Sequence, residues 1–162
     1  MKIPFTTALI IGSSRGIGRG IAVKLAREGV QKIAVHYRTR KKEAETTVSQ
    51  LREAGATAIL VQGDVADPTV AENIVNEAAS KLGGCDIFIL SVVPPLEEIY
   101  EHTMSTEVPL AKWQLAFDTQ ARGFFVCART AAKYMTRGGR ILALSYTPGA
   151  RTGGCSAPSG SK

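Results

Sequence analysis

The 162-residue chain has no apolar run that approaches the roughly 20 residues needed for a membrane-spanning helix. Its three cysteines, Cys85, Cys127 and Cys155, are far apart and show no metal-ligand spacing. The two histidines, His36 and His102, also stand alone, and we interpret them as surface or loop residues. We therefore expect no metal site and no structural disulfide, which favours a cytoplasmic location.

The sequence also lacks the patterns by which proteins recognise nucleic acid. No recognition helix is evident, and arginine is not interleaved with aromatic residues. The net charge of +6 is therefore interpreted as a basic surface, and not as a nucleic-acid interface.

A glycine-rich turn near the N-terminus organises the rest of the chain. The apolar run Ala8–Ile11 predicts a buried strand, Gly12–Gly18 forms the turn, and helical periodicity starts at Ile17. Because the apolar run leads straight into the turn, we interpret this segment as a strand and not as a signal peptide. Strand, turn and helix together direct backbone N–H groups and a positive helix end at a phosphate. This placement predicts dinucleotide binding, with a purely structural turn as the alternative.

Five apolar stretches alternate with helical patterns along the chain. Strands are predicted at residues 8–11, 32–36, 57–62, 86–90 and 140–144. This alternation is typical of right-handed βαβ units and predicts an α/β fold, a Rossmann-like doubly wound parallel sheet of about five strands. We expect a dinucleotide-binding domain over residues 1–150 and a tail rich in Gly, Ser and Pro over residues 151–162.

Two helices carry clear boundary signals. Asp67 followed by Pro68 predicts the start of one helix, and Gly83 predicts its end. Pro109 predicts the start of a long helix that ends at residues 138–139. The residues of this long helix interpreted as packing or core residues include Trp113, Phe117 and Cys127.

The cofactor type is predicted from the end of the second strand. An NAD-selective site places an acidic residue there for the ribose hydroxyls, but residues 32–42 contain none. Four basic residues stand there instead: Arg38, Arg40, Lys41 and Lys42. Positive charge at a helix start opposes the helix dipole unless an anion is present, and Arg15 of the glycine turn can reach the same region. A 2′-phosphate would account for this charge, so we expect NADP(H) in preference to NAD(H), with a solvated basic face as the alternative.

Ligands of such sheets bind beyond the carboxyl ends of the strands. Asp64 follows the third strand, where its carboxylate and the Val65 N–H can bind an adenine edge. A turn that leads into a helix explains Asp64 almost as well. The expected cofactor-binding residues are Gly12, Ser14, Arg15, Gly16, Ile17, Gly18, Arg38, Asp64, Val65 and Ser91.

Three motifs resemble those of the short-chain dehydrogenase/reductase family: Gly12-x-x-x-Gly16-x-Gly18, Gly63-Asp64-Val65, and Gly139-Arg140-Ile141 before a strand that ends in Ser145. The resemblance leans toward members similar to enoyl-acyl-carrier-protein reductase or to ketoacyl reductase. It implies NADP(H)-dependent hydride transfer to a carbonyl or an enoyl thioester, with a small-molecule or acyl-thioester substrate and a place in fatty acid synthesis. It also implies a homo-oligomer for intact members of the family.

The chain departs from the family at the catalytic positions. The resemblance implies that Ser145 polarises the substrate carbonyl, that Lys162 holds the ribose, and that a tyrosine four residues before the lysine is the general acid. Pro158 stands at that tyrosine position, and Gln120 aligns with the family's helix asparagine. Tyr146 is the fallback acid. The alternative function is therefore a catalytically impaired dinucleotide-binding or interaction module.

Relative to the resembled family, further helices and strands would follow Lys162. We interpret the sequence as truncated at the C-terminus, so the sheet is incomplete and its fifth strand is an exposed edge. The substrate and the oligomeric state are left open.

Overall fold

The computed structural model describes residues 4–93 and 109–145 of the chain. Its elements are β1 (Thr7–Ile11), α1 (Gly16–Arg27), β2 (Lys32–Tyr37), α2 (Lys41–Glu53), β3 (Thr57–Gln62), α3 (Pro68–Leu82), β4 (Ile87–Leu90), α5 (Leu110–Phe117), the π-helical turn η2 (Asp118–Arg122), α6 (Gly123–Ala132) and β5 (Arg140–Ala143). The predicted residues Tyr146, Pro158 and Lys162, together with His102, Cys155 and the tail 151–162, lie outside the described residues.

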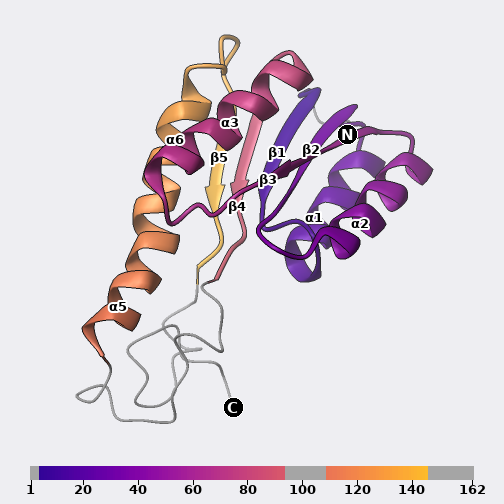
Figure 1. Cartoon of the computed structure of the whole chain (residues 1–162). Helices are drawn as coiled ribbons and strands as arrows, with labels where there is room; N and C mark the ends of the chain where they lie inside the picture. Colours follow the sequence, from indigo (N-terminus) through magenta and orange to yellow (C-terminus); the bar gives the residue numbers. More distant parts are fainter. Residues whose placement is uncertain (1–3, 94–108, 146–162) are drawn as a thin grey trace.

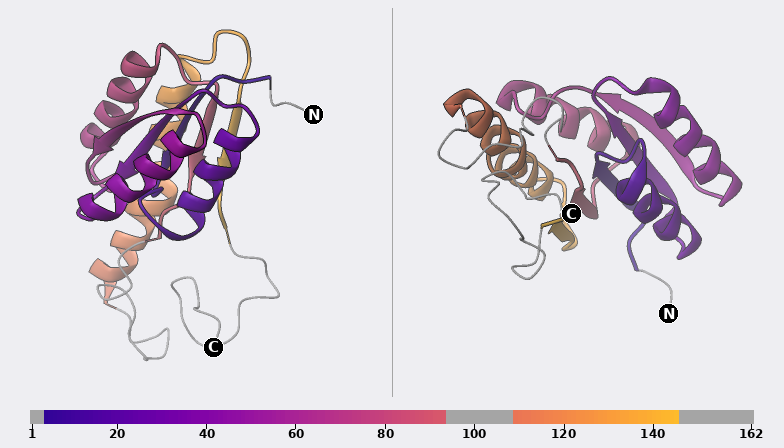
Figure 2. Two further views of the ribbon diagram at one scale, coloured as in Figure 1. Left: turned by 90° about the vertical axis from the view of Figure 1, so that its right-hand side faces the viewer. Right: turned by 90° about the horizontal axis from the view of Figure 1, so that it is seen from below.

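The five strands form one parallel sheet in the order β3-β2-β1-β4-β5. The chain runs outward from β1 to β3, then crosses back to place β4 on the other side of β1. Figures 1 and 2 show α1 and α2 on one face of the sheet and α3 and α6 on the other. The predicted doubly wound α/β fold is therefore confirmed. The reversal between β1 and β4 creates the switch point at which such sheets bind ligands.

Two hydrophobic cores hold the helices to the sheet. All five residues of β1 are buried, because its side chains alternate between the two faces and both faces are covered. Ile10 packs with residues of α1 and α2, whereas Leu9 and Ile11 pack with residues of α3 and α6. Cys127 belongs to the second core, as predicted, and burial raises the pKa of its thiol to about 12.

A polar junction fixes β1 beside β4 at the amino ends of the strands. One carboxylate oxygen of Asp86 accepts hydrogen bonds from the backbone N–H groups of Thr6 and Thr7 at 2.9 and 3.0 Å. It also accepts bonds from both threonine hydroxyls, at 3.1 and 3.0 Å. Burial raises the pKa of Asp86, but these hydrogen bonds outweigh it and leave the pKa below its usual value.

The boundary signals of α3 act as predicted. The Asp67 carboxylate accepts hydrogen bonds from the N–H groups of Thr69 and Val70 at 2.8 and 3.0 Å, which caps the helix. Gly83 ends it in the left-handed conformation, with φ at 79°.

The long helix predicted from Pro109 to residues 138–139 is wrong in its continuity and its end. Pro109 is the N-cap, the turn η2 interrupts the helix, and α6 ends at Ala132. The π-helical turn lies beside the segment that follows β3. There Arg122 donates a hydrogen bond to the Ala66 carbonyl at 2.8 Å, and a Cβ on Gly123 would lie 2.9 Å from the Val65 carbonyl oxygen. We attribute the extra residue in the turn to this close approach.

The interpretation of Trp113 and Phe117 as packing residues is also wrong. Each is 47% exposed, and their rings stack on each other with centroids 5.6 Å apart. By contrast, β5 is the exposed edge that we expected: all four of its residues are exposed, including Ile141 and Leu142.

Across residues 4–93 and 109–145, no helix has the length and apolar character to cross a membrane. The same part of the chain contains no group of three or more His, Cys, Asp or Glu residues placed to hold a metal ion.

Candidate dinucleotide-binding site

The glycine turn lies between β1 and α1, at the carboxyl edge of the sheet beside β4. Gly12 has φ at +81°, and a Cβ there would lie 2.4 Å from the Ser91 carbonyl oxygen. A Cβ on Gly18 would lie 2.3 Å from the Gly12 carbonyl oxygen. Gly16 has φ at +57°, yet a Cβ there would meet nothing within 4 Å. Two of the glycines therefore permit close backbone packing, and the third leaves an open approach to the turn.

The first turn of α1 is suited to an anion. Its N-cap residue, Arg15, has extended backbone and makes no side-chain capping hydrogen bond, and the first turn contains no acidic residue. The N–H groups of a helix start carry partial positive charge, which a ligand phosphate could meet. Ser14 is buried at this turn, whereas Ile17 is 70% exposed beside it. A glycine turn with an open helix start thus fits the pyrophosphate of a dinucleotide.

His36 is a buried residue beside the glycine turn that the sequence interpretation missed. It was expected at the surface or in a loop, but it is 2% exposed, at the end of β2. Its Nδ1 accepts a hydrogen bond from the Gly12 N–H at 3.1 Å, and its Nε2 lies 3.0 Å from the Gly63 carbonyl oxygen. Because Nδ1 is an acceptor, Nε2 carries the proton and donates. The imidazole therefore joins the glycine turn to the segment before Asp64.

Burial keeps the imidazole neutral. Burial lowers the pKa of His36 to about 4, although the Gly63 carbonyl and the charge of Asp64 act in the opposite direction. The backbone N–H of His36 also donates to the hydroxyl of Ser13 at 3.1 Å. Sequence spacing could not reveal these bonds, because most of the groups that His36 contacts belong to the backbone.

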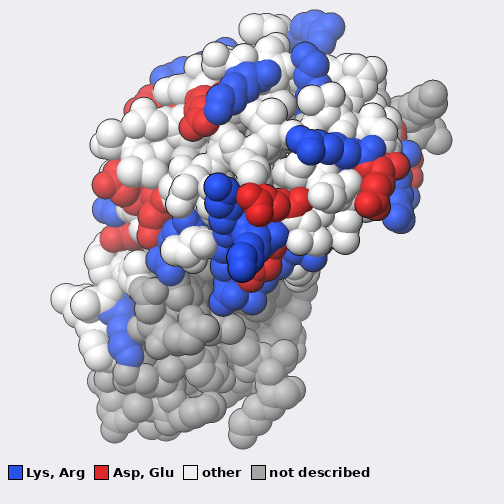
Figure 3. Space-filling model, turned by 45° about the vertical axis from the view of Figure 1, so that its right-hand side comes forward, with Lys and Arg blue, Asp and Glu red and all other residues white. Residues whose placement is uncertain are grey.

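The predicted basic cluster is Arg38, Arg40, Lys41 and Lys42, and it carries acidic neighbours. Arg38 pairs with Asp64 at 3.2 Å, Arg40 with Glu43 at 3.3 Å, and Lys41 with Glu45 at 4.0 Å. Figure 3 shows basic and acidic side chains interspersed on one side of the molecule. Three of the four basic residues of this region therefore take part in exposed ion pairs.

Asp64 has two roles within the protein itself. One carboxylate oxygen bonds Arg38, and the other accepts a hydrogen bond from the Ala66 N–H at 3.0 Å. The second bond is that of a turn residue, so the turn explanation of Asp64 describes part of what it does. The next residue, Val65, is buried.

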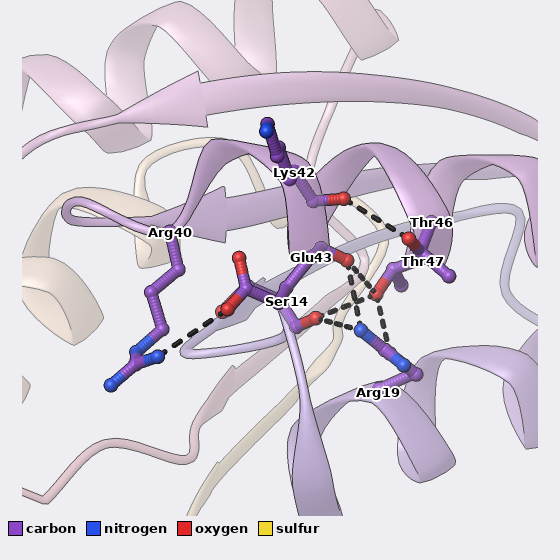
Figure 4. Close-up of polar contacts among 7 residues, drawn as sticks. All are labelled: Ser14, Arg19, Arg40, Lys42, Glu43, Thr46 and Thr47. Carbon is purple, nitrogen blue, oxygen red and sulfur yellow. Dashed lines mark hydrogen bonds and ion pairs between the residues drawn. The ribbon is translucent and has the colours of Figure 1, made fainter.

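A polar network ties the glycine turn to α2 (Figure 4). The Arg19 guanidinium donates to the Ser14 carbonyl at 2.6 Å, to the Glu43 carbonyl at 2.9 Å and to the Thr47 hydroxyl at 2.9 Å. Thr47 is fully buried, and its hydroxyl lies 3.0 Å from the Ser14 carbonyl oxygen. The turn and the start of α2, which carries the basic cluster, are thus held in one arrangement.

The remaining candidates follow β4 and β5. The Ser91 N–H donates to the Ile11 carbonyl at 2.9 Å, which places Ser91 beside the glycine turn. Ser145 is exposed just beyond β5, at the same edge of the sheet. Gln120 lies half-buried in the π-helical turn η2.

A parallel sheet with a glycine turn and a helix start at its switch point is the architecture of Rossmann-type folds. The sequence model of the enoyl-(acyl carrier protein) reductase family matches residues 11–159. The chain belongs to the short-chain dehydrogenase/reductase family of oxidoreductases.

Similar proteins include 3-oxoacyl-(acyl-carrier-protein) reductase FabG of Staphylococcus aureus, which is 32% identical over 146 residues. Versicolorin reductase stcU of Emericella nidulans is 33% identical over 138 residues. These alignments cover 89% and 85% of this chain, but 57% and 50% of the relatives. The chain therefore spans little more than half the length of these relatives.

Solved structures show the same relationship. A short-chain dehydrogenase/reductase of Serratia marcescens superposes with a TM-score of 0.83 at 29% identity, over 94% of this chain and 60% of that one. A short-chain dehydrogenase of Burkholderia cenocepacia in complex with NADP superposes with a TM-score of 0.77 at 30% identity, over 85% of this chain and 54% of that one.

Proposed function

We propose that this chain binds NADP(H) in preference to NAD(H) and acts as a reductase that transfers hydride to a carbonyl or an enoyl thioester. The observation that carries the cofactor proposal is the cationic end of β2, where Arg38 and Arg40 stand and an NAD-selective acid is absent from residues 32–42. The similarity to a Burkholderia cenocepacia enzyme that binds NADP supports it.

The proposed roles follow the positions of the residues at the sheet edge. The turn Gly12–Gly18 and the first N–H groups of α1 hold the pyrophosphate, and Arg15 with Arg38 binds the 2′-phosphate. Asp64 and Val65 border the adenine, and Ser91 borders the cofactor beside β4. The bound dinucleotide supplies the hydride.

The catalytic roles are proposed from the family resemblance. Ser145 donates a hydrogen bond to the substrate carbonyl, Lys162 holds the ribose, and Tyr146 supplies the proton. We propose a dinucleotide-binding domain over residues 1–150, followed by the tail 151–162 at the position of the active-site loop. We also propose an acyl thioester of fatty acid synthesis or a related small molecule as the substrate, and a cytoplasmic location. A homo-oligomer is proposed for intact members of the family. The relatives named for the reduction of 3-oxoacyl groups support the substrate class.

A second function is favoured by one observation. Pro158 stands where the family has its general-acid tyrosine, and proline can neither donate nor accept a side-chain proton. A chain of this kind would bind the dinucleotide without reducing a substrate.

Turnover separates the two functions. We expect purified protein to oxidise NADPH in the presence of an acetoacetyl or crotonyl thioester, and Tyr146→Phe to lower kcat by about a hundredfold if Tyr146 supplies the proton. Absorbance at the reduced-nicotinamide band reports the rate. NADPH binding without turnover on any thioester or ketone of the panel would establish the second function.

The cofactor preference has its own test. We expect Arg38→Gln to weaken NADPH binding about tenfold, because it removes a charge-assisted contact with the phosphate, and to leave NADH binding within about twofold. Nucleotide fluorescence titration measures both dissociation constants. Arg52→Gln is the matched control, since Arg52 lies in the last turn of α2, at the far end of that helix from the basic cluster, and its loss changes the net charge equally. Equal losses for NADPH and NADH would contradict the role of Arg38.

A further inference from the structure

Glu43 is the acidic residue of the first turn of α2, within the basic cluster. Its carboxylate lies 3.3 Å from the Arg40 guanidinium. Figure 4 shows that the side chain points toward Arg40, whereas the backbone carbonyl points toward Arg19 and Thr47. The start of α2 thus already holds an anion of the protein itself, in the region where the cations of the cluster gather.

The position of Glu43 is fixed relative to the glycine turn. Its carbonyl accepts a hydrogen bond from Arg19 at 2.9 Å, and the same guanidinium nitrogen donates to the Ser14 carbonyl at 2.6 Å. Thr47 is fully buried and lies between the two carbonyls. The backbone of Glu43 is therefore held at a set place beside the turn, and its carboxylate extends from that place to Arg40.

This carboxylate stays ionised. A hydrogen bond from its own backbone N–H lowers the pKa of Glu43, slight burial opposes it, and the bond and charge of Arg40 and the charge of Arg15 lower it further. Of these two cations, Arg40 at the start of α2 is the one that pairs directly with the carboxylate.

We propose that Glu43 is a specificity-determining residue: paired with Arg40, it competes with the 2′-phosphate of NADP(H) for the positive charge of the basic cluster. The inference rests on the proposed NADP(H) site. A phosphate bound there carries about two negative charges and must share or displace the carboxylate, which costs affinity through repulsion and through the loss of the Arg40–Glu43 pair. NAD(H) has a neutral hydroxyl in place of the 2′-phosphate, so the carboxylate does not change its affinity. Glu43 therefore reduces the preference for NADP(H) over NAD(H) that the cations create.

The test compares two variants of one helix. Glu43→Gln removes the carboxylate but keeps the backbone carbonyl that Arg19 and Thr47 contact, and Glu45→Gln makes the same charge change at an exposed residue that pairs with Lys41. At low ionic strength we expect Glu43→Gln to tighten NADPH binding about three- to tenfold and to leave NADH binding within about twofold. Glu45→Gln should change neither by more than about twofold.

Adenosine 2′,5′-bisphosphate and 5′-AMP serve as further probes, because they differ in the 2′-phosphate and lack the nicotinamide half. The first should bind Glu43→Gln more tightly than the native protein, and the second equally. Glu43→Ala repeats the test without an amide, and thermal unfolding confirms that both variants are folded.

Three outcomes would overturn the proposal. Weaker NADPH binding to Glu43→Gln would show that Glu43 orders Arg40 for the phosphate, and does not compete with it. Equal changes in NADPH affinity in Glu43→Gln and Glu45→Gln would show that the change comes from net charge and not from the position of Glu43. Unchanged affinities would leave Glu43 without a role in selectivity, while the proposed function stands. If the native protein binds neither NADPH nor NADH, the proposed function fails, and this inference fails with it.

Discussion

Gly18→Ala should unfold the glycine turn and abolish dinucleotide binding. The added methyl group would lie 2.3 Å from the carbonyl oxygen of Gly12 and 2.9 Å from its carbonyl carbon. Both are backbone atoms of the turn and cannot move aside without displacing the first turn of α1. We expect a loss of about 3 kcal/mol in the free energy of unfolding, typical of severe overpacking. NADPH affinity should fall more than about tenfold, measured by fluorescence titration beside urea denaturation.

Gly20→Ala provides the control for this substitution. Gly20 lies two residues further along α1, and a Cβ there would meet nothing within 4 Å. Alanine is the better helix former, so this variant should gain about 0.5–1 kcal/mol in the free energy of unfolding and bind NADPH normally. If Gly18→Ala is as stable as Gly20→Ala and binds as well, the packing of the turn described above is incorrect.

The pH dependence of stability should show the burial of His36. Its pKa is about 4 in the folded protein, against 6.5 for an unperturbed histidine. Between these values the unfolded chain binds a proton that the folded chain does not, so stability falls as the pH decreases from about 6.5 to 4. The full contribution of His36 to the free energy of unfolding is present above pH 6.5, and about 3 kcal/mol of it is lost by pH 4. Urea denaturation at a series of pH values measures it.

Two variants isolate this contribution from that of the carboxylates. His36→Asn keeps an acceptor near the place of Nδ1 for the Gly12 N–H, and His36→Gln keeps a donor near the place of Nε2 for the Gly63 carbonyl. Neither variant titrates, so the stability advantage of the native protein over each should shrink as the pH falls through this window. A constant difference from pH 7 to pH 4 would mean that His36 is not buried as a neutral imidazole.

Much of the fold could be predicted because its signals are local. Asp67, Pro68 and Gly83 delimit α3 through bonds and backbone angles that involve their near neighbours, so their identities suffice to place the boundaries. The apolar runs place the strands within one or two residues, since a strand buried on both faces needs such a run. The expected edge at β5 came instead from the family resemblance.

The errors come from contacts between distant segments. His36 occupies a strand position whose bonds reach Gly12 and Gly63, 24 and 27 residues away, and no local pattern encodes them. The turn η2 depends on Gly123 approaching the Val65 carbonyl, which helical periodicity does not reveal. Trp113 and Phe117 share a helical face that predicts packing, but the stacked pair is half exposed.

One of the ion pairs of the basic cluster could have been predicted from the sequence. Arg40 and Glu43 are three residues apart at a helix start, a spacing at which opposite charges meet. Arg38 and Asp64, by contrast, come together because β2 and β3 are neighbours in the sheet and end at the same edge. The prediction of the cofactor type therefore considered the positive charge without its acidic partners. The structure showed that Glu43 and Asp64 pair with two of these cations.

The two strands that flank β1 differ in their separation from it along the chain. Pairing β1 with β2 joins residues about 25 apart in the chain, whereas pairing β1 with β4 joins residues 79 apart, which raises the entropy cost of closure by about 1 kcal/mol. The three strands β1 to β3 can therefore assemble first, and β4 closes onto them later. In this order the carboxyl ends of β1 and β4 come together last, so we expect the candidate dinucleotide site to form only after β1 to β3 have assembled.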